Sequence, residues 1–223
     1  MTEFFLTVNR VSKFYGDVRA VDRASLEIGE GSTLVIQGAS GSGKTTLLRL
    51  IAGLELPDDG EISINGEGAN GPGRSLPPHM RKMGFVFQAP ALWPHLTVAD
   101  NILFGLAGRP RRENRQRMEE LLERTGLAGL QKRYPDQLSG GQARRVSLAR
   151  ALAPEPSCLL MDEPLTNLDD DLKDKMLSLI KEELSRLGSA MIYVTHDSSE
   201  ASALSKWVIF MERGRLTDHL PNR

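Results

Sequence analysis

The stretch Thr33-Leu-Val-Ile-Gln-Gly-Ala-Ser-Gly-Ser-Gly-Lys-Thr45 decides the fold of this chain. It opens with a short apolar run, Thr33 to Gln37, which predicts a buried strand. The residues that follow the run match the pattern G-x-x-x-x-G-K-[ST]. Leucine and isoleucine then recur at helical spacing from Leu47 to Leu54, so a helix is expected next. A strand, a glycine-rich loop and a helix in this order are typical of a loop that binds phosphate groups.

The glycine-rich loop suits a bound phosphate for physical reasons. Glycines let backbone N–H groups turn inward toward phosphate oxygens, and the helix N-terminus adds the positive end of its dipole. We expect Lys44 to reach the β- and γ-phosphates of a nucleotide and the Thr45 hydroxyl to bind Mg²⁺. The residues expected to cradle the phosphates are Gly38, Ala39, Ser40, Gly41, Ser42, Gly43, Lys44, Thr45 and Thr46. The alternative is a glycine-rich turn that carries a lysine by chance.

Outward from this loop, further short apolar runs predict buried strands with helices between most of them. The runs are Phe85 to Phe87, Cys158 to Met161, Met191 to Thr195 and Val208 to Met211. Amphipathic helical patterns include Met118 to Arg124 and Leu172 to Leu187. This alternation predicts an α/β fold around a mainly parallel sheet.

Three segments depart from the alternation. Leu6 to Val11 and Ala24 to Ile28 alternate apolar and polar residues, which predicts an antiparallel β subdomain at the N-terminus. The segment from about Pro90 to Pro154 lacks strand patterns and predicts an inserted helical subdomain. The Gly/Pro-rich segment Asn65 to Pro78 predicts a surface loop that only connects. We therefore expect one domain, 1–223, with an α/β core of about 1–89 and 155–223.

Composition excludes several classes of protein. The 223 residues carry 28 Lys and Arg against 29 Asp and Glu, so the formal net charge is −1 and no nucleic-acid partner is expected. The one cysteine cannot form an internal disulfide, which fits a reducing compartment. No apolar stretch approaches the ~20 residues of a membrane-spanning helix, and the N-terminus lacks the features of a signal peptide. We expect a soluble, cytoplasmic protein.

Two further motifs carry chemistry. The run Cys158 to Met161 ends in Asp162 and Glu163, and ligands bind at the carboxyl ends of strands in open parallel sheets. Asp162 is expected to help hold Mg²⁺ and Glu163 to act as a general base toward water, although acidic residues also end many ordinary strands.

The second motif is Leu138-Ser-Gly-Gly-Gln142 at the start of a helical pattern, where it predicts a second anion-binding nest or a plain helix cap at Ser139. Because one nucleotide needs only one phosphate loop, the pair predicts a head-to-tail dimer that shares its sites.

With these motifs in this order, the sequence resembles the ATP-binding-cassette (ABC) ATPase family. The resemblance runs from about Leu6 to about Leu216. It implies a P-loop NTPase (RecA-like) core, binding of ATP with Mg²⁺, and ATP hydrolysis. Lys44, Asp162, Glu163 and His196 all have the residue type that the family's catalytic set requires.

The resemblance also implies roles for other positions. Tyr15 matches the aromatic residue that stacks on adenine, with a surface turn residue as the alternative. Gln88 matches the glutamine that senses Mg²⁺ and water, with a polar strand end as the alternative. His196 matches the histidine that bonds the γ-phosphate, although a histidine at a strand end is often structural. Asp169 matches a residue that communicates across the dimer, and it also suits an N-cap. The residues expected to act across the dimer are Ser139, Gly140, Gly141, Gln142 and Asp169.

The partners follow from the same resemblance. The segment from Ala91 to Ile102 looks like the part of importer-type cassettes that docks a permease helix, and Trp93 and Leu96 are expected to line the groove unless Trp93 belongs to the core. The implied partners are a second copy of the chain, an integral membrane permease and a substrate-binding protein, which places the chain on the inner face of the cell membrane. An exporter or lipoprotein-release cassette is the alternative, followed by a soluble ABC ATPase without a transport role. Several importers of this kind carry a regulatory β-domain after the cassette, and none is expected in these 223 residues.

The basic run Arg109 to Arg117 predicts a solvated approach to a helix, or a contact with lipid headgroups.

Overall fold

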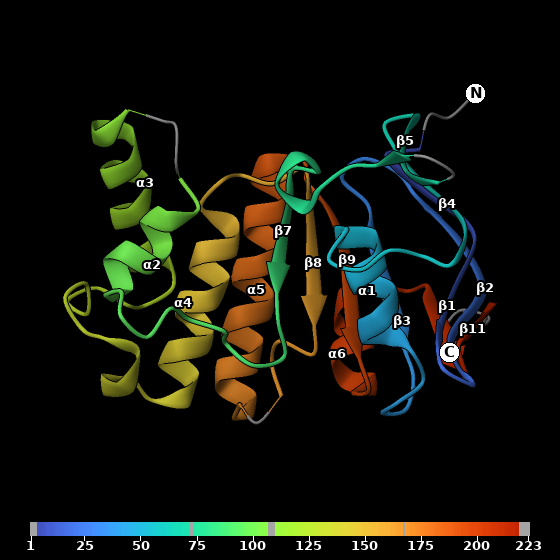
Figure 1. Cartoon of the computed structure of the whole chain (residues 1–223). Coiled ribbons are helices and arrows are strands. Elements are labelled where there is room, and N and C mark those ends of the chain that lie inside the picture. The colour runs from blue at the N-terminus through green and yellow to red at the C-terminus, as the bar shows by residue number, and fades with distance from the viewer. Residues whose placement is uncertain (1–3, 72–73, 107–109, 167, 219–223) are drawn as a thin grey trace.

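The computed structural model describes residues 4–71, 74–106, 110–166 and 168–218. They form two β-sheets, with helix α1 (Lys44–Ala52) packed between them, while the longer helices α4 (Gly140–Leu152) and α5 (Asp170–Leu187) cover the opposite face of the larger sheet (Figure 1). Helices α2 (Val98–Phe104) and α3 (Arg111–Arg124) lie beyond α4, at the end of the molecule farthest from the smaller sheet. The predicted α/β fold is confirmed.

The larger sheet is parallel except at one edge. Its order is β11-β10-β3-β9-β8-β7, and β10 and β11 alone pair in an antiparallel sense. The strands are β3 (Thr33–Gln37), β7 (Met83–Val86), β8 (Cys158–Asp162), β9 (Ala190–Thr195), β10 (Val208–Glu212) and β11 (Arg215–Asp218). The predicted apolar runs therefore lie in neighbouring parallel strands, whose carboxyl ends meet at one edge of the sheet.

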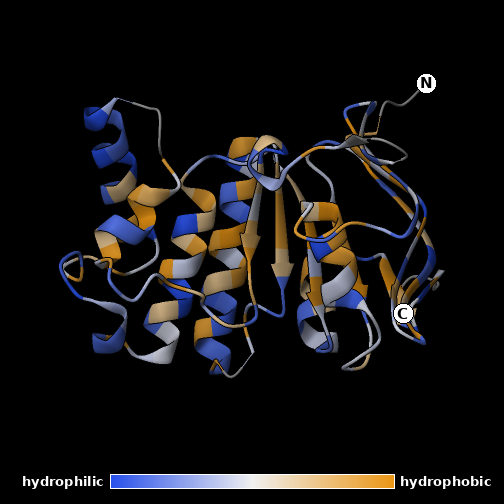
Figure 2. Cartoon of the chain, in the orientation of Figure 1, coloured by the Kyte–Doolittle hydropathy of each residue, from blue (hydrophilic) through white to orange (hydrophobic). Residues whose placement is uncertain are grey.

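The continuous apolar run of β8 serves two cores at once. Cys158 and Leu160 pack in the core around α1, whereas Leu159 and Met161 pack in the core on the other face, with α4 and α5. Successive strand residues point to opposite faces, so a strand covered by helices on both sides has no polar face. Figure 2 shows β8 as predominantly hydrophobic, whereas α3 at the edge of the molecule is mainly hydrophilic.

The smaller sheet is antiparallel, as the alternating N-terminal segments predict. Its order is β2-β1-β4-β5-β6. The strands are β1 (Leu6–Tyr15), β2 (Val18–Ile28), β4 (Asp59–Ile64), β5 (Glu67–Gly71) and β6 (Arg74–Ser75).

The prediction of a connecting loop from Asn65 to Pro78 was wrong. Asn65 and Gly66 have φ of 51° and 75° and form a tight turn that folds β5 back onto β4. Ala69 and Asn70 are buried, and a short 3₁₀ helix, η1 (Pro78–Met80), follows the strands. The many glycines hide the alternation by which such strands are recognised. Residues 72 and 73 of the segment lie outside the described residues.

The segment between β7 and β8 is helical in its described residues. It holds α2, α3, the 3₁₀ helix η2 (Pro135–Gln137) and α4, and it contains no strand among those residues. This composition supports the predicted helical subdomain, whose limits stay a prediction. Helix α6 (Ser198–Leu204) completes the fold beside β3 and β9.

The basic run Arg109 to Arg117 is not an approach to a helix, because α3 itself begins at Arg111. Arg117 is buried rather than solvated, and its Nη2 lies 3.1 Å from Oε2 of the buried Glu183 on α5. Arg109 lies outside the described residues. The last part of the run therefore ties α3 to α5.

Candidate functional site

The glycine-rich loop between β3 and α1 is pressed against two other strands. A Cβ atom at Gly38 would lie 2.3 Å from the carbonyl oxygen of Met211 on β10. Gly43 has a φ of 110°, and a Cβ atom there would lie 2.1 Å from the carbonyl oxygen of Ala20 on β2. Both positions therefore require glycine, and the loop is held rigidly before any ligand binds.

Lys44 curls back over this loop. Its Nζ donates to the carbonyl oxygens of Gly38 at 2.7 Å and Ala39 at 2.9 Å, and it lies 3.6 Å from Oε1 of Glu163. The side chain is buried. A cation is thus fixed at the mouth of the loop, where an anion would be bound.

Thr45 and Asp162 place two oxygen ligands side by side. The Thr45 hydroxyl donates to Oδ1 of Asp162 at 3.0 Å, and Asp162 is only 3% exposed. Burial raises the pKa of Asp162, the bond from Thr45 opposes that rise, and the charge of Glu163 adds to it. Mg²⁺ prefers oxygen ligands and commonly takes one or two from protein, so the pair suits this ion.

Glu163 has an unusual backbone that aims its carboxylate. Its φ is 45°, in the left-handed region, and its N–H donates to the carbonyl oxygen of Val194 at 2.9 Å. Oε2 of Glu163 lies 3.0 Å from Nδ1 of His196, which follows the end of β9. Because β8 and β9 are neighbours, their carboxyl ends bring Glu163 and His196 together beside Lys44.

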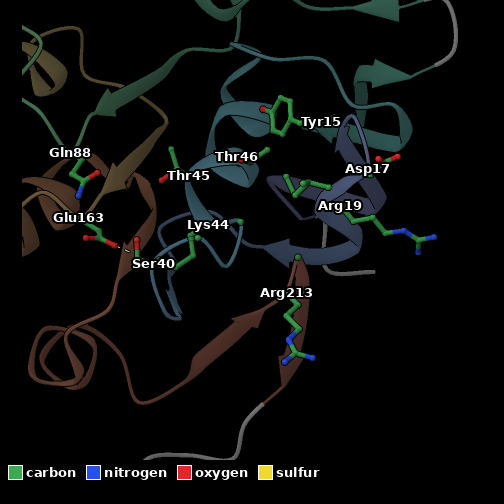
Figure 3. Close-up of a pocket in the computed structure, with 15 residues that line it drawn as sticks. Tyr15, Asp17, Arg19, Ser40, Lys44, Thr45, Thr46, Gln88, Glu163 and Arg213 are labelled. Atoms are coloured by element: carbon green, nitrogen blue, oxygen red, sulfur yellow. Dashed lines mark ion pairs between the residues drawn. The ribbon is translucent and has the colours of Figure 1, made fainter.

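A cleft of about 700 Å³ opens above the loop, a size that suits a nucleotide-sized ligand. Figure 3 shows Gln88 and Glu163 at one end and Asp17 and Arg19 at the other, with Lys44 between them. The predicted site residues that line the cleft are Tyr15, Ser40, Gly41, Gly43, Lys44, Thr45, Thr46, Gln88 and Glu163. Tyr15 ends β1 and is 47% exposed, so its ring is accessible. The carbonyl oxygen of Gln88 accepts a bond from Nη1 of Arg144 at 3.0 Å.

Two turns contribute lining residues that the sequence motifs do not include. They are Asp17, Val18, Arg19 and Ala20 from the β1–β2 region, and Arg213 and Gly214 from the β10–β11 turn. The turns are joined, because the Asp22 N–H donates to the carbonyl oxygen of Gly214 at 2.8 Å. The Gly214 N–H in turn donates to the carbonyl oxygen of Ser42 at 2.9 Å. In the sequence, the glycines Gly16 and Gly214 indicate turns at these two places, but a turn glycine does not indicate that a ligand binds there.

The second motif lies away from this cleft. None of Ser139, Gly140, Gly141, Gln142 and Asp169 lines it. Ser139 caps α4, since its Oγ accepts from the Gln142 N–H at 3.2 Å and Gln142 Oε1 accepts from the Ser139 N–H at 3.0 Å. Asp169 caps α5 by accepting from the Leu172 N–H at 2.9 Å. The two helix starts are adjacent, because a Cβ atom at Gly141 would lie 3.3 Å from Leu172.

A family model described as ABC transporter matches residues 21–166. The chain belongs to the ABC transporter family. Among solved structures, it is similar to the ATP-binding cassette MJ0796, a dimer in a post-hydrolysis state bound to ADP and Pi. The two share 32% identity with a TM-score of 0.89, over 98% of this chain and 99% of that one.

Curated relatives of this ABC cassette are import proteins by name. The Fe(3+) ions import ATP-binding protein FbpC of Pasteurella multocida is 44% identical over 97% of this chain and 62% of its own length. The sulfate/thiosulfate import ATP-binding protein CysA 2 of Chromobacterium violaceum is 47% identical over 95% of this chain and 57% of its own length. The ABC cassette described here thus spans about three fifths of these relatives.

Proposed function

We propose that this chain is the ATP-binding subunit of an ABC importer, which hydrolyses ATP as a head-to-tail dimer and powers uptake through a separate membrane permease. The observation that carries the proposal is the position of Glu163, held between Lys44 and His196 at the mouth of the phosphate loop. The names of the import ATP-binding relatives support the direction of transport. Within the described residues, no helix combines the length and apolar character needed to cross a bilayer.

Six side chains in and beside the cleft have parts in this reaction. The triphosphate of ATP lies on the glycine-rich loop, and Lys44 leaves its two carbonyl partners to bond the β- and γ-phosphates. Glu163 orients the attacking water and takes its proton, while His196 turns from Glu163 toward the γ-phosphate. Thr45 and Asp162, with Gln88 in the same cleft as Thr45, would hold Mg²⁺, which would supply positive charge to offset the charge of the phosphates.

In the proposed dimer, the second copy of the chain supplies the Ser139 to Gln142 motif to the nucleotide site of the first. Ser139 to Gln142 form the N-terminus of α4, which does not line the cleft, and Asp169 caps the adjacent start of α5. A head-to-tail dimer brings this surface of one chain onto the γ-phosphate in the other. Closure then depends on ATP, and hydrolysis opens the dimer.

A groove lined mainly by apolar side chains is the surface that we assign to the permease. It has a volume of about 450 Å³ and is lined by Met83, Gly84, Phe85, Phe87, Ala91, Trp93, Phe104, Arg150, Ala151 and Pro154. Trp93 is 45% exposed and Phe104 is 61% exposed, so Trp93 is not a core residue. Leu96, half-buried, is not among the lining residues. The occupant is an amphipathic cytoplasmic helix of the permease, which holds the chain at the inner face of the membrane.

Cargo selection lies with the permease and a substrate-binding protein. The relatives named above are import proteins for iron(III) and for sulfate or thiosulfate, and they share this cassette. ATP chemistry is the same for each ion, so the cleft has no means of distinguishing them.

The first test replaces the proposed base. Glu163→Gln keeps the shape of the side chain and removes the proton acceptor, so ATP binding persists while turnover falls by about a hundredfold or more. Size-exclusion chromatography should show a dimer with Mg·ATP and a monomer without it. Steady-state ATPase activity equal to that of the unmodified chain would remove Glu163 from the reaction.

The same variant tests the transport role. Tagged Glu163→Gln is expressed in its source cell, membranes are solubilised with ATP and Mg²⁺, and the co-purifying proteins are identified. A multi-spanning membrane protein is expected, and Trp93→Glu in the same background should release it while leaving ATP binding unchanged. If only soluble proteins, ribosomes or DNA co-purify, the ATPase chemistry stands and the transport role falls.

A further inference from the structure

The ring of Tyr15 is only partly covered by the rest of the chain. Tyr15 is 47% exposed at the end of β1 and lines the cleft beside Thr46, as Figure 3 shows. A side chain with this exposure has several accessible rotamers, and each must be given up when a base stacks on it. A polar contact at the hydroxyl is therefore the available means of fixing the ring.

That contact comes from the short loop that follows α1. The Tyr15 hydroxyl donates to Oε2 of Glu55. The other carboxylate oxygen of Glu55 accepts from Nη1 of Arg49 at 3.3 Å, and Arg49 lies in the last turn of α1. Glu55 thus joins the tyrosine to the helix whose first residues, Lys44 and Thr45, face the phosphates.

The same loop also fixes the backbone before Tyr15. Oδ2 of Asp58 accepts from the Phe14 N–H at 2.7 Å, and Oδ1 lies 3.0 Å from Nζ of Lys13. Lys13 lies 5.9 Å from the centre of the Tyr15 ring. With the backbone anchored by Asp58, the rotation that remains at Tyr15 is that of the side chain, which hydrogen bonds of the hydroxyl with Glu55 and with Thr46 restrain.

We propose that Glu55 is a positioning residue that holds the Tyr15 ring ready to stack on the base of the nucleotide. Glu55 is not among the residues that line the cleft, so it acts through Tyr15. The inference rests on the proposed function, because it needs a nucleotide whose base lies on Tyr15. As a consequence, Glu55 contributes to recognition of the nucleobase and not to recognition of the phosphates.

The test compares a ligand that carries a nucleobase with a ligand that lacks one. Calorimetry on the full chain measures Kd for Mg·ATP and for Mg·tripolyphosphate. Glu55→Ala should raise Kd for ATP about threefold to tenfold, the range of an aromatic stack, and leave Kd for tripolyphosphate within about twofold. Glu55→Gln keeps an acceptor for the Tyr15 hydroxyl and should restore most of the loss.

Tyr15→Ala and Tyr15→Phe complete the design. Tyr15→Ala should weaken ATP binding and spare tripolyphosphate binding, and Tyr15→Phe combined with Glu55→Ala should weaken it no more than either change alone. The matched control is Glu119→Ala, which breaks an exposed pair with Arg115 of 2.9 Å on α3 and should change neither Kd.

The outcomes distinguish failure of the role of Glu55 from failure of the proposed function. If Tyr15→Ala weakens ATP binding and Glu55→Ala does not, Glu55 has no positioning role and the proposed function stands. Equal weakening of both ligands by Glu55→Ala, with a lowered unfolding midpoint, would show a general structural role and overturn the inference. If Tyr15→Ala leaves ATP binding unchanged, the base lies elsewhere, and both the role of Tyr15 and that of Glu55 fall.

Discussion

At the residue scale, Asp162 combines deep burial with a negative charge. Its carboxylate is 3% exposed and 3.0 Å from the Thr45 hydroxyl. Burial raises its pKa above the ordinary 3.8, so the folded chain holds the proton more tightly than the unfolded chain does. As the pH rises from the pKa of Asp162 in the unfolded chain to its higher pKa in the folded chain, the free energy of unfolding falls. At neutral pH the charge therefore opposes folding, and we attribute its presence to the metal that we propose it binds.

We predict that Asp162→Asn stabilises the nucleotide-free chain and removes its ATPase activity. The unfolding midpoint should rise by about 2–4 °C for each kcal/mol gained. The difference in unfolding midpoint between Asp162→Asn and the unmodified chain should grow as the pH rises from about 4 through the raised pKa of Asp162. Thermal unfolding across pH, beside an ATPase assay, measures both. A variant less stable than the unmodified chain at neutral pH would contradict this account.

At the element scale, the C-terminus of α1 is held by one buried arginine. Nη1 of Arg81 donates to the carbonyl oxygens of Leu50 at 3.2 Å and Ile51 at 2.7 Å, and Nη2 donates to Oδ1 of Asn70 at 2.6 Å. Arg81 is 2% exposed, and burial lowers its pKa to about 10, so it stays charged at neutral pH. A cation at this end of the helix is favourable to the helix dipole. The arginine thus joins the phosphate-loop helix to β5.

We predict that Arg81→Met destabilises the chain by about 2–4 kcal/mol, because the buried carbonyl of Ile51 and the side-chain oxygen of Asn70 lose the hydrogen bonds that Arg81 donates. Urea unfolding measures the change. Arg115→Met is the control, since Arg115 is exposed and its pair with Glu119 is worth under about 1 kcal/mol. Equal effects of the two substitutions would show that the buried contacts of Arg81 contribute little.

At the scale of the whole molecule, the cleft and the Ser139 surface occupy different parts of one chain. In the proposed dimer, a nucleotide in the cleft of one chain contacts Ser139 of the second chain. We therefore infer that the proposed dimer serves the chemistry of the site rather than the stability of the fold.

We predict complementation between two inactive chains. Lys44→Ala loses its own phosphate site, and Ser139→Arg blocks the site of its partner, so each homodimer is inactive. A mixed dimer has one intact site, made of Lys44 from one chain and Ser139 from the other. Random mixing should restore up to about a quarter of the unmodified ATPase activity. No activity above that of the separate variants would contradict a shared site.

The sequence alone determined the parts that depend on local spacing. The strand, the glycine-rich loop and α1 follow from one run of residues, and the strand before Asp162 and the cap at Ser139 follow from others. The chemistry of each motif is contained within a few neighbouring residues, so its chain order and residue types are sufficient to predict it. The parallel sheet follows from the repeated alternation of such units.

The tertiary structure decided what depends on contacts between distant residues. Pairing of β10 with β3 carries the β10–β11 turn to the cleft, the chain return after α1 brings Glu55 to Tyr15, and Arg81 reaches back to Leu50. The strands after Asn65 and the burial of Arg117 against Glu183 were missed for the same reason. A partner remote in the chain leaves no periodic signal in the sequence near the residue that it contacts, because periodicity records only which face of an element is buried.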